Sequence, residues 1–136
     1  MLLDKFLLMS DSQNLSQGVA IASTSYIDTN AIGDDYAGCW YVATVESVFT
    51  ATTTSGTLTL ALQTDSSSAF GTATTVIQSA ALTSAVAVAG YTFKARIPTG
   101  LKRYIRVLMT SSNTCSTGIV SNFIVKDADC NTQMVA

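Results

Sequence analysis

A strict alternation of apolar and polar side chains limits the fold of this chain more than any other feature of its sequence. Leu58, Leu60 and Leu62 are separated by hydroxyl-bearing or small side chains. Successive side chains of a β-strand point to opposite faces, so these leucines would share one face. The same period recurs over residues 91–97 and 103–110. The pattern predicts half-buried antiparallel strands, each with a core face and an outer face.

Runs of this kind occur along the whole chain, separated by clusters of Gly, Ser, Thr, Asn and Asp. We predict eight strands, at residues 2–9, 19–27, 40–50, 57–64, 74–82, 91–97, 103–110 and 119–126. Ser and Thr make up 36 of the 136 residues, which favours short strands over long helices. Without a βαβ rhythm, these strands predict an all-β fold, an antiparallel two-sheet β-sandwich of jelly-roll type, with an immunoglobulin-like sandwich as the alternative.

Length and charge bound the organisation and the partners. A chain of 136 residues fits one domain, which we place at residues 1–127, followed by a C-terminal tail at 128–136. The formal net charge is −2, and 12% of the residues are charged, against roughly 25% in average soluble domains. This balance supplies no broad cationic surface, so nucleic acid is not an expected partner. The low charge predicts a protein that covers much of its surface in an assembly.

Membrane insertion is not expected either. Polar or charged residues interrupt every stretch before it reaches the roughly 18 apolar residues that a spanning helix needs. The apolar N-terminal segment carries Asp4 and Lys5 and lacks the basic leader and cleavage site of a signal peptide.

The composition argues against an enzyme. The sequence contains no histidine, so serine and cysteine nucleophiles would lack their commonest general base. Asp34 and Asp35, with Glu46, form the one acidic concentration that could serve glycoside hydrolysis. However, the two aspartates follow Gly33 in a turn-like segment, and Glu46 is expected to point outward from a strand. The loop also lacks the ligand spacing of an EF-hand, so no calcium site is predicted.

The cysteines give no metal site. Cys39, Cys115 and Cys130 are odd in number, lie far apart and have no histidine to join them. We expect reduced thiols, with Cys39 as a small core residue beside Trp40, and no cofactor.

The basic residues are concentrated in one part of the chain. Five of the seven lie between positions 94 and 106, namely Lys94, Arg96, Lys102, Arg103 and Arg106. If the strands on either side of Pro98-Thr99-Gly100 formed a hairpin, their outer faces would carry the charges as one patch. Arginine can bind carboxylates with two parallel hydrogen bonds, so the patch suits an acidic protein surface. The alternative is that these are ordinary solvated charges.

Five segments of the chain together resemble one known family. They are LLDKFLLMSDSQ at 2–13, LALQTDSSSAFGTA at 60–73, AGYTF at 89–93, IPTGLKRYIRV at 97–107 and GIVSNFIVKD at 118–127. In this order and spacing they resemble the small capsid cement, or decoration, proteins of tailed bacteriophages. The resemblance implies a jelly-roll protein on the outer surface of the capsid of the virion. There it would bind the major capsid protein of an HK97-like head and clamp neighbouring subunits.

This resemblance directs attention to two candidate contact regions. One is the basic patch, and the other is the N-terminal segment with Leu2, Leu3 and Phe6, which would be either a capsid-binding arm or an edge strand of the core. Copies are expected to form a homo-oligomer, and the general prevalence of two-fold symmetry favours a dimer over a trimer.

A carbohydrate- or receptor-binding β-sandwich module of a phage tail or fibre is the alternative function. It would require a flat platform of exposed aromatic rings, for which Trp40, Tyr26, Tyr36 and Tyr41 are the candidates.

Overall fold

The computed structural model describes residues 7–16, 18–29, 38–52 and 55–126. These ranges hold ten strands, and none of their residues belongs to an α-helix. The strands are β1 (Leu8–Asn14), β2 (Ala20–Ala22), β3 (Ile27–Asp28), β4 (Trp40–Ala51), β5 (Thr57–Asp65), β6 (Thr74–Gln78), β7 (Leu82–Thr83), β8 (Thr92–Arg96), β9 (Tyr104–Ser111) and β10 (Cys115–Val125).

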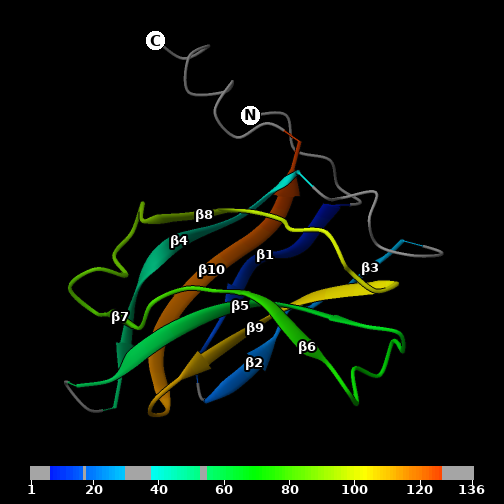
Figure 1. Ribbon diagram of the computed structural model, residues 1–136. Helices are drawn as coiled ribbons and strands as arrows, with labels where there is room; N and C mark the ends of the chain where they lie inside the picture. The colour runs from blue at the N-terminus through cyan, green and yellow to red at the C-terminus, as the bar shows by residue number, and fades with distance from the viewer. Residues whose placement is uncertain (1–6, 17, 30–37, 53–54, 127–136) are drawn as a thin grey trace, which may run out of the picture.

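The strands form two antiparallel sheets that pack face to face (Figure 1). The four-stranded sheet has the order β1-β10-β4-β8. The six-stranded sheet has the main order β2-β9-β5-β6, with β3 also paired to β9 and β7 to β5. The predicted all-β sandwich is therefore confirmed.

The order of the strands is that of a jelly roll. Eight strands pair as four nested antiparallel couples, β1 with β10, β2 with β9, β4 with β8 and β5 with β6. The couples belong alternately to the four-stranded and the six-stranded sheet. The chain thus follows one long hairpin that is rolled up until β4 meets β10 and β5 meets β9. This arrangement agrees with the jelly-roll prediction rather than the immunoglobulin-like alternative.

The hydrophobic core lies between the sheets and consists of the apolar residues of the alternating pattern. Leu58, Leu60 and Leu62 of β5 are at most 1% exposed. Ile105, Val107 and Met109 of β9 are equally buried, and Tyr104, Arg106 and Leu108 between them lie on the outer face. Cys39 packs against the core as predicted. Each strand therefore contributes one apolar row to a shared interior.

A row of hydrogen-bonded polar side chains is buried at the four-stranded sheet. The buried Tyr41 donates its hydroxyl to Oδ1 of Asn122 at 2.8 Å, and Nδ2 of Asn122 donates to Oγ of Ser10 at 2.7 Å. Burial raises the pKa of Tyr41, so the phenol stays neutral. The chain of hydrogen bonds links β4, β10 and β1 through groups that would otherwise be desolvated without partners.

Several predicted strand bounds are wrong. The first strand begins at Leu8 and continues to Asn14, whereas residues 2–6 of the predicted strand lie outside the described residues. The region 19–27 contains the short strand β2 and the start of β3, and the region 74–82 contains β6 and the start of β7. The last strand starts at Cys115 instead of 119. Polar β1 residues were missed because the strand they pair with, β10, is distant in sequence, as in the pairing of Gln13 with Val120.

The predicted hairpin around Pro98-Thr99-Gly100 does not form. Strand β8 pairs with β4 in one sheet and β9 pairs with β5 in the other. The connection crosses the open end of the sandwich, with Ile97 and Leu101 buried in the core. Nested jelly-roll pairing explains this, since successive couples belong to different sheets.

Candidate functional site

The five clustered basic residues are divided between the two sheets. Lys94 and Arg96 are exposed on the outer face of β8, whose Phe93 points into the core. Arg106 lies on the outer face of β9, in the other sheet, and Lys102 and Arg103 directly precede this strand. The single basic patch expected from a hairpin is therefore wrong, and the charges form two separate surfaces.

The surface of the four-stranded sheet combines these cations with an apolar cluster. Trp40 pairs with Arg96 across the ladder, and the guanidinium lies 5.9 Å from the centroid of the indole. The outer cluster consists of the buried Val42, Phe123 and Val125, with the partly buried Leu8 and Trp40 packed against them. Trp40 is thus part of an outer apolar cluster rather than of the core between the sheets.

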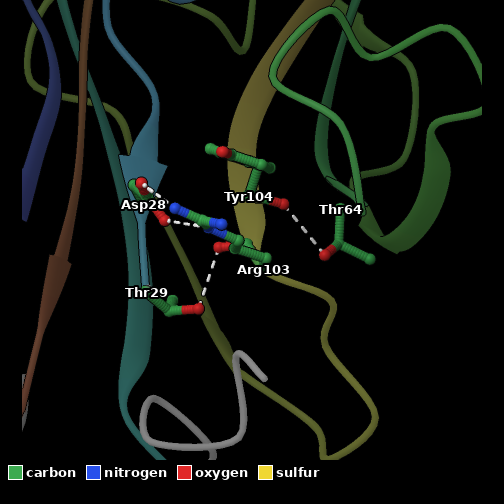
Figure 2. Close-up of polar contacts among 5 residues, drawn as sticks. All are labelled: Asp28, Thr29, Thr64, Arg103 and Tyr104. Carbon is green, nitrogen blue, oxygen red and sulfur yellow. Dashed lines mark hydrogen bonds and ion pairs between the residues drawn. The ribbon is translucent and has the colours of Figure 1, made fainter. Parts of the chain in front are cut away.

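On the six-stranded sheet, Arg103 is engaged within the chain. Its Nε and Nη2 donate to the two carboxylate oxygens of Asp28 at 2.8 and 3.0 Å (Figure 2). The hydrogen bond to Asp28 raises the pKa of Arg103. The backbone nitrogen and the hydroxyl of Thr29 both donate to the carbonyl of Arg103, at 2.9 and 2.8 Å. Side chain and backbone together attach the start of β9 to β3.

A buried threonine attaches the same point to β5. The hydroxyl of Thr64 donates to the carbonyl of Tyr104 at 3.0 Å (Figure 2). It also accepts the backbone N–H of Lys102 at 2.8 Å. Thr64 is 1% exposed, so water does not compete for these bonds. The segment that carries Arg103 and Tyr104 is therefore held from both neighbouring strands.

Three aromatic rings gather beside this segment. Tyr104 lies 5.6 Å from Tyr26 and 6.5 Å from Phe70, and Tyr26 lies 6.0 Å from Phe70, measured between ring centroids. All three pairs meet edge to face, at interplanar angles of 65–77°. Phe70 is buried, whereas Tyr26 is 50% exposed. The three rings form a hydrophobic cluster in which Tyr26 is half exposed to solvent. Because the rings meet edge to face, the cluster does not form a flat platform.

Phe70 reaches the cluster through an unusual backbone conformation. Its φ is +53°, in the left-handed region that costs most residues about 1–3 kcal/mol. The loop between β5 and β6 holds it there by means of Asp65, a fully buried residue. This carboxylate accepts the backbone N–H groups of Ser66, Ser67 and Thr72 at 2.6, 3.3 and 2.9 Å, and also the Thr72 hydroxyl.

These bonds also decide the charge of Asp65. Burial alone raises the pKa of Asp65, but the hydrogen bonds from Thr72, Ser67 and Ser66 outweigh it and leave the pKa below its usual value. The carboxylate is therefore ionised at neutral pH and acts as the organising group of the loop. The loop in turn covers the outer face of β5 and β9 with Phe70.

Arg106 lies on the ring that this loop positions. Its guanidinium is 4.5 Å from the centroid of Phe70, and its Nε donates to Oε1 of Gln63 at 3.0 Å. Gln63 and Arg106 are register partners on β5 and β9. The two terminal amino groups of Arg106 have no hydrogen-bond partner among the described residues. We name Tyr26, Phe70, Tyr104, Arg103 and Arg106 the arginine-aromatic face.

The sequence identified only part of this face. It indicated Tyr26, Arg103 and Arg106 but gave no role to Phe70, or to Gln63 and Asp65, which support the face. The run Asp-Ser-Ser-Ser followed by Ala-Phe-Gly is a turn signal, and an aspartate before serines is a common backbone acceptor. That signal identifies the loop, but it does not show that the loop folds back over the sheet.

The other candidate residues are placed as follows. Glu46 points outward, as predicted, and accepts hydroxyl hydrogen bonds from Ser12 and Ser121, which lower its pKa.

Seven of the candidate residues lie outside the described residues, namely Leu2, Leu3, Phe6, Asp34, Asp35, Tyr36 and Cys130. Tyr41 is buried and cannot join a platform. Cys39 and Cys115 carry free thiols, and no group of three potential metal ligands occurs in the described ranges.

A sequence model of the Bbp16 family matches residues 9–124. The chain belongs to the Bbp16 family. Bbp16 proteins are phage proteins, in agreement with the phage resemblance of the sequence. The matched region runs from Met9 in β1 to Ile124 in β10, so it includes strands of both sheets and the arginine-aromatic face. A comparison with curated proteins gives no match.

No helix among the described residues is long and apolar enough to cross a membrane.

Proposed function

We propose that this Bbp16-family protein is a capsid cement protein. It binds the outer surface of the phage head and stabilises contacts between subunits of the major capsid protein. It acts there as a structural protein without enzymatic activity. Membership of a phage family, the jelly-roll sandwich and the sequence resemblance to decoration proteins support this proposal together.

The observation that carries the proposal is a charge-free side of the sandwich. Residues 66–93 contain no Asp, Glu, Lys or Arg. Of these, residues 74–91 form β6, β7 and the loop to β8, which we name the charge-free side. The loop runs along β4, where N–H of Phe49 donates to the carbonyl of Ala87 and N–H of Gly90 to that of Val45. This segment therefore joins the edges of the two sheets (Figure 1).

Apolar groups are exposed on this side. Val86 and Val88 are 46% and 42% exposed, and Ala85 and Ala89 beside them are exposed as well. Val48 of β4, near the same edge, is 38% exposed. Burying small apolar side chains against a partner requires little desolvation of polar groups. Depletion of charged residues is also what distinguishes the centre of protein interfaces from the remaining surface.

A clamp needs two contact surfaces, and this protein offers two of different chemistry. The charge-free side suits an apolar contact, and the arginine-aromatic face suits an acidic one. Binding to adjacent subunits adds the free energy of both contacts to the assembled shell, because separated subunits cannot occupy both at once. Repetition over a lattice multiplies the effect.

Co-sedimentation with phage heads stripped of the protein tests the proposal. Saturable binding at a fixed ratio, together with greater heat resistance of the heads, is the expected result. The variant with Val86→Glu and Val88→Glu should fold but bind much less, because it places two charges on the charge-free side. A matched variant, Val19→Glu with Ala20→Glu, adds the same charge at exposed positions outside both surfaces. If wild-type protein fails to bind, the cement function is wrong, and a glycan array then tests the carbohydrate-binding alternative.

A further inference from the structure

Resting on the proposed function, we infer that Arg106 is the residue of the arginine-aromatic face that binds a carboxylate of the shell protein, whereas Arg103 positions the face. The two arginines lie three positions apart and carry the same charge. Their surroundings in the folded protein separate their roles.

The hydrogen bonds of the two guanidinium groups differ. Arg103 directs Nε and Nη2 to both oxygens of Asp28, so its fork already holds a carboxylate of its own chain. A second carboxylate would have to displace Asp28. Arg106 uses only Nε, for Gln63, and its terminal amino groups have no partner among the described residues. Arg106 therefore retains the donors that a carboxylate from outside requires.

The position of Arg106 is fixed before a partner arrives. Its guanidinium stacks on Phe70, and Gln63 fixes the direction of Nε. Phe70 is itself fixed by the loop around Asp65 and by its contacts with Tyr26 and Tyr104. An arginine that loses little rotational freedom on binding forms a stronger contact than a mobile one.

The chemistry of the face favours an acidic side chain of a protein over an acidic sugar. The planar guanidinium matches a carboxylate, with two parallel hydrogen bonds. The neighbouring rings meet at 65–77°, and Arg106 covers the buried Phe70, so the described cluster provides no flat aromatic surface for a sugar ring. The half-exposed Tyr26 provides an amphipathic contact typical of protein interfaces.

Binding of four proteins to stripped heads tests this inference. They are the wild type, Arg106→Gln, Arg106→Lys and the control Lys126→Gln, which removes one exposed charge directly after β10. We expect Arg106→Gln to weaken binding about tenfold or more, as expected when one partner of a buried charge pair is lost. Arg106→Lys should recover only part of this loss, because an ammonium group cannot form the fork. Lys126→Gln should change binding less than twofold. Melting curves of the free proteins establish that each variant is folded.

Two outcomes would overturn the inference while leaving the cement function intact. In the first, wild type binds saturably and Arg106→Gln binds equally well. In the second, Lys126→Gln weakens binding as much as Arg106→Gln, which would indicate a general charge effect. Competition identifies the partner chemistry, and polyglutamate should displace the wild type from heads at lower concentration than polygalacturonate. The opposite order would assign the site to acidic sugars and overturn the inference. Absence of wild-type binding would instead reject the cement function itself.

Discussion

The outer faces of the two sheets have different compositions although the same alternation predicted both. On the four-stranded sheet, Val42, Phe123 and Val125 point away from the central core and are nevertheless at most 7% exposed. On the six-stranded sheet, the outer face carries arginine, glutamine and tyrosine, with Tyr26 half exposed. One outer face is partly closed by apolar side chains, and the other presents polar groups.

The difference shows how the sequence pattern of a strand relates to the burial of its two faces. Residues 40–43 and 123–125 are apolar at consecutive positions, which is typical of strands buried on both faces. By contrast, β9 alternates regularly and has one buried face. A uniform run thus marks a doubly buried region, and regular alternation marks a strand whose outer face stays open to solvent.

Truncation of Phe123 tests the contrast most directly. Phe123→Ala should lower the free energy of unfolding by about 3–5 kcal/mol, the usual loss for a buried phenylalanine. The half-buried Leu108 occupies the outer face of β9, and Leu108→Ala should cost well under half as much. Urea denaturation measures both. Equal losses would mean that the outer faces are buried to a similar degree.

Removal of one hydroxyl tests the buried row of hydrogen-bonded polar side chains at the four-stranded sheet. Tyr41→Phe deprives Oδ1 of Asn122 of its donor in the interior, at a cost of about 1–3 kcal/mol. Tyr26→Phe is the matched control, because its hydroxyl has no hydrogen bond to another described residue and its ring is half exposed. Denaturation curves should show a loss for the first variant alone. A loss of equal size in both would mean that the buried hydrogen bond adds no more stability than an exposed phenolic hydroxyl does.

The acid dependence of stability distinguishes the faces through one carboxylate on each. Asp65 and Glu46 both have lowered pKa values in the folded protein. Each therefore stabilises the fold above its ordinary pKa, and this stabilisation is lost as the pH falls through the lowered value. Asp65→Asn should flatten the decline of melting temperature between pH 5 and pH 2 more than Glu46→Gln, because Asp65 is buried and binds more donors. The reverse ranking would contradict the organising role of Asp65.

The exposed ion pair should have the smallest effect. The side chains of Arg103 and Asp28 are 42% and 38% exposed, so solvent screens their attraction. A double-mutant cycle with Arg103→Gln and Asp28→Asn should give a coupling below the loss for Tyr41→Phe, and 1 M salt should reduce it further. A coupling that is large and independent of salt would show that the pair is effectively buried.

The regular strands could be predicted because their signal is local. Leu58, Leu60 and Leu62 identify β5 without knowledge of any partner, and residues 103–110 identify β9 in the same way. The partner strands of β8 and of β9 could not be predicted from neighbouring positions in the sequence. Sequential strands usually pair, but a jelly roll places these two in opposite sheets.

The arginine-aromatic face was only partly predictable for a related reason. The sequence shows neither the partner of Arg103 nor that of Arg106, because Asp28 and Phe70 approach them from distant parts of the chain. The position of Phe70 depends on a left-handed residue and a buried aspartate, neither of which has a periodic signal. Composition indicated the charges, and tertiary structure decided which of them is free to bind.

The pairing of β1 with β10 has a practical consequence for engineering. Leu8 and Phe123 are register partners, so the first and last strands finish side by side at one end of the four-stranded sheet. Peptides attached directly before Leu8 and directly after Val125 would therefore leave the sheet in the same region, which suits display of paired cargo. A linker that joins Val125 to Leu8, with new termini opened between Ser112 and Asn113 in the turn after β9, should give a circular permutant that keeps every strand pair.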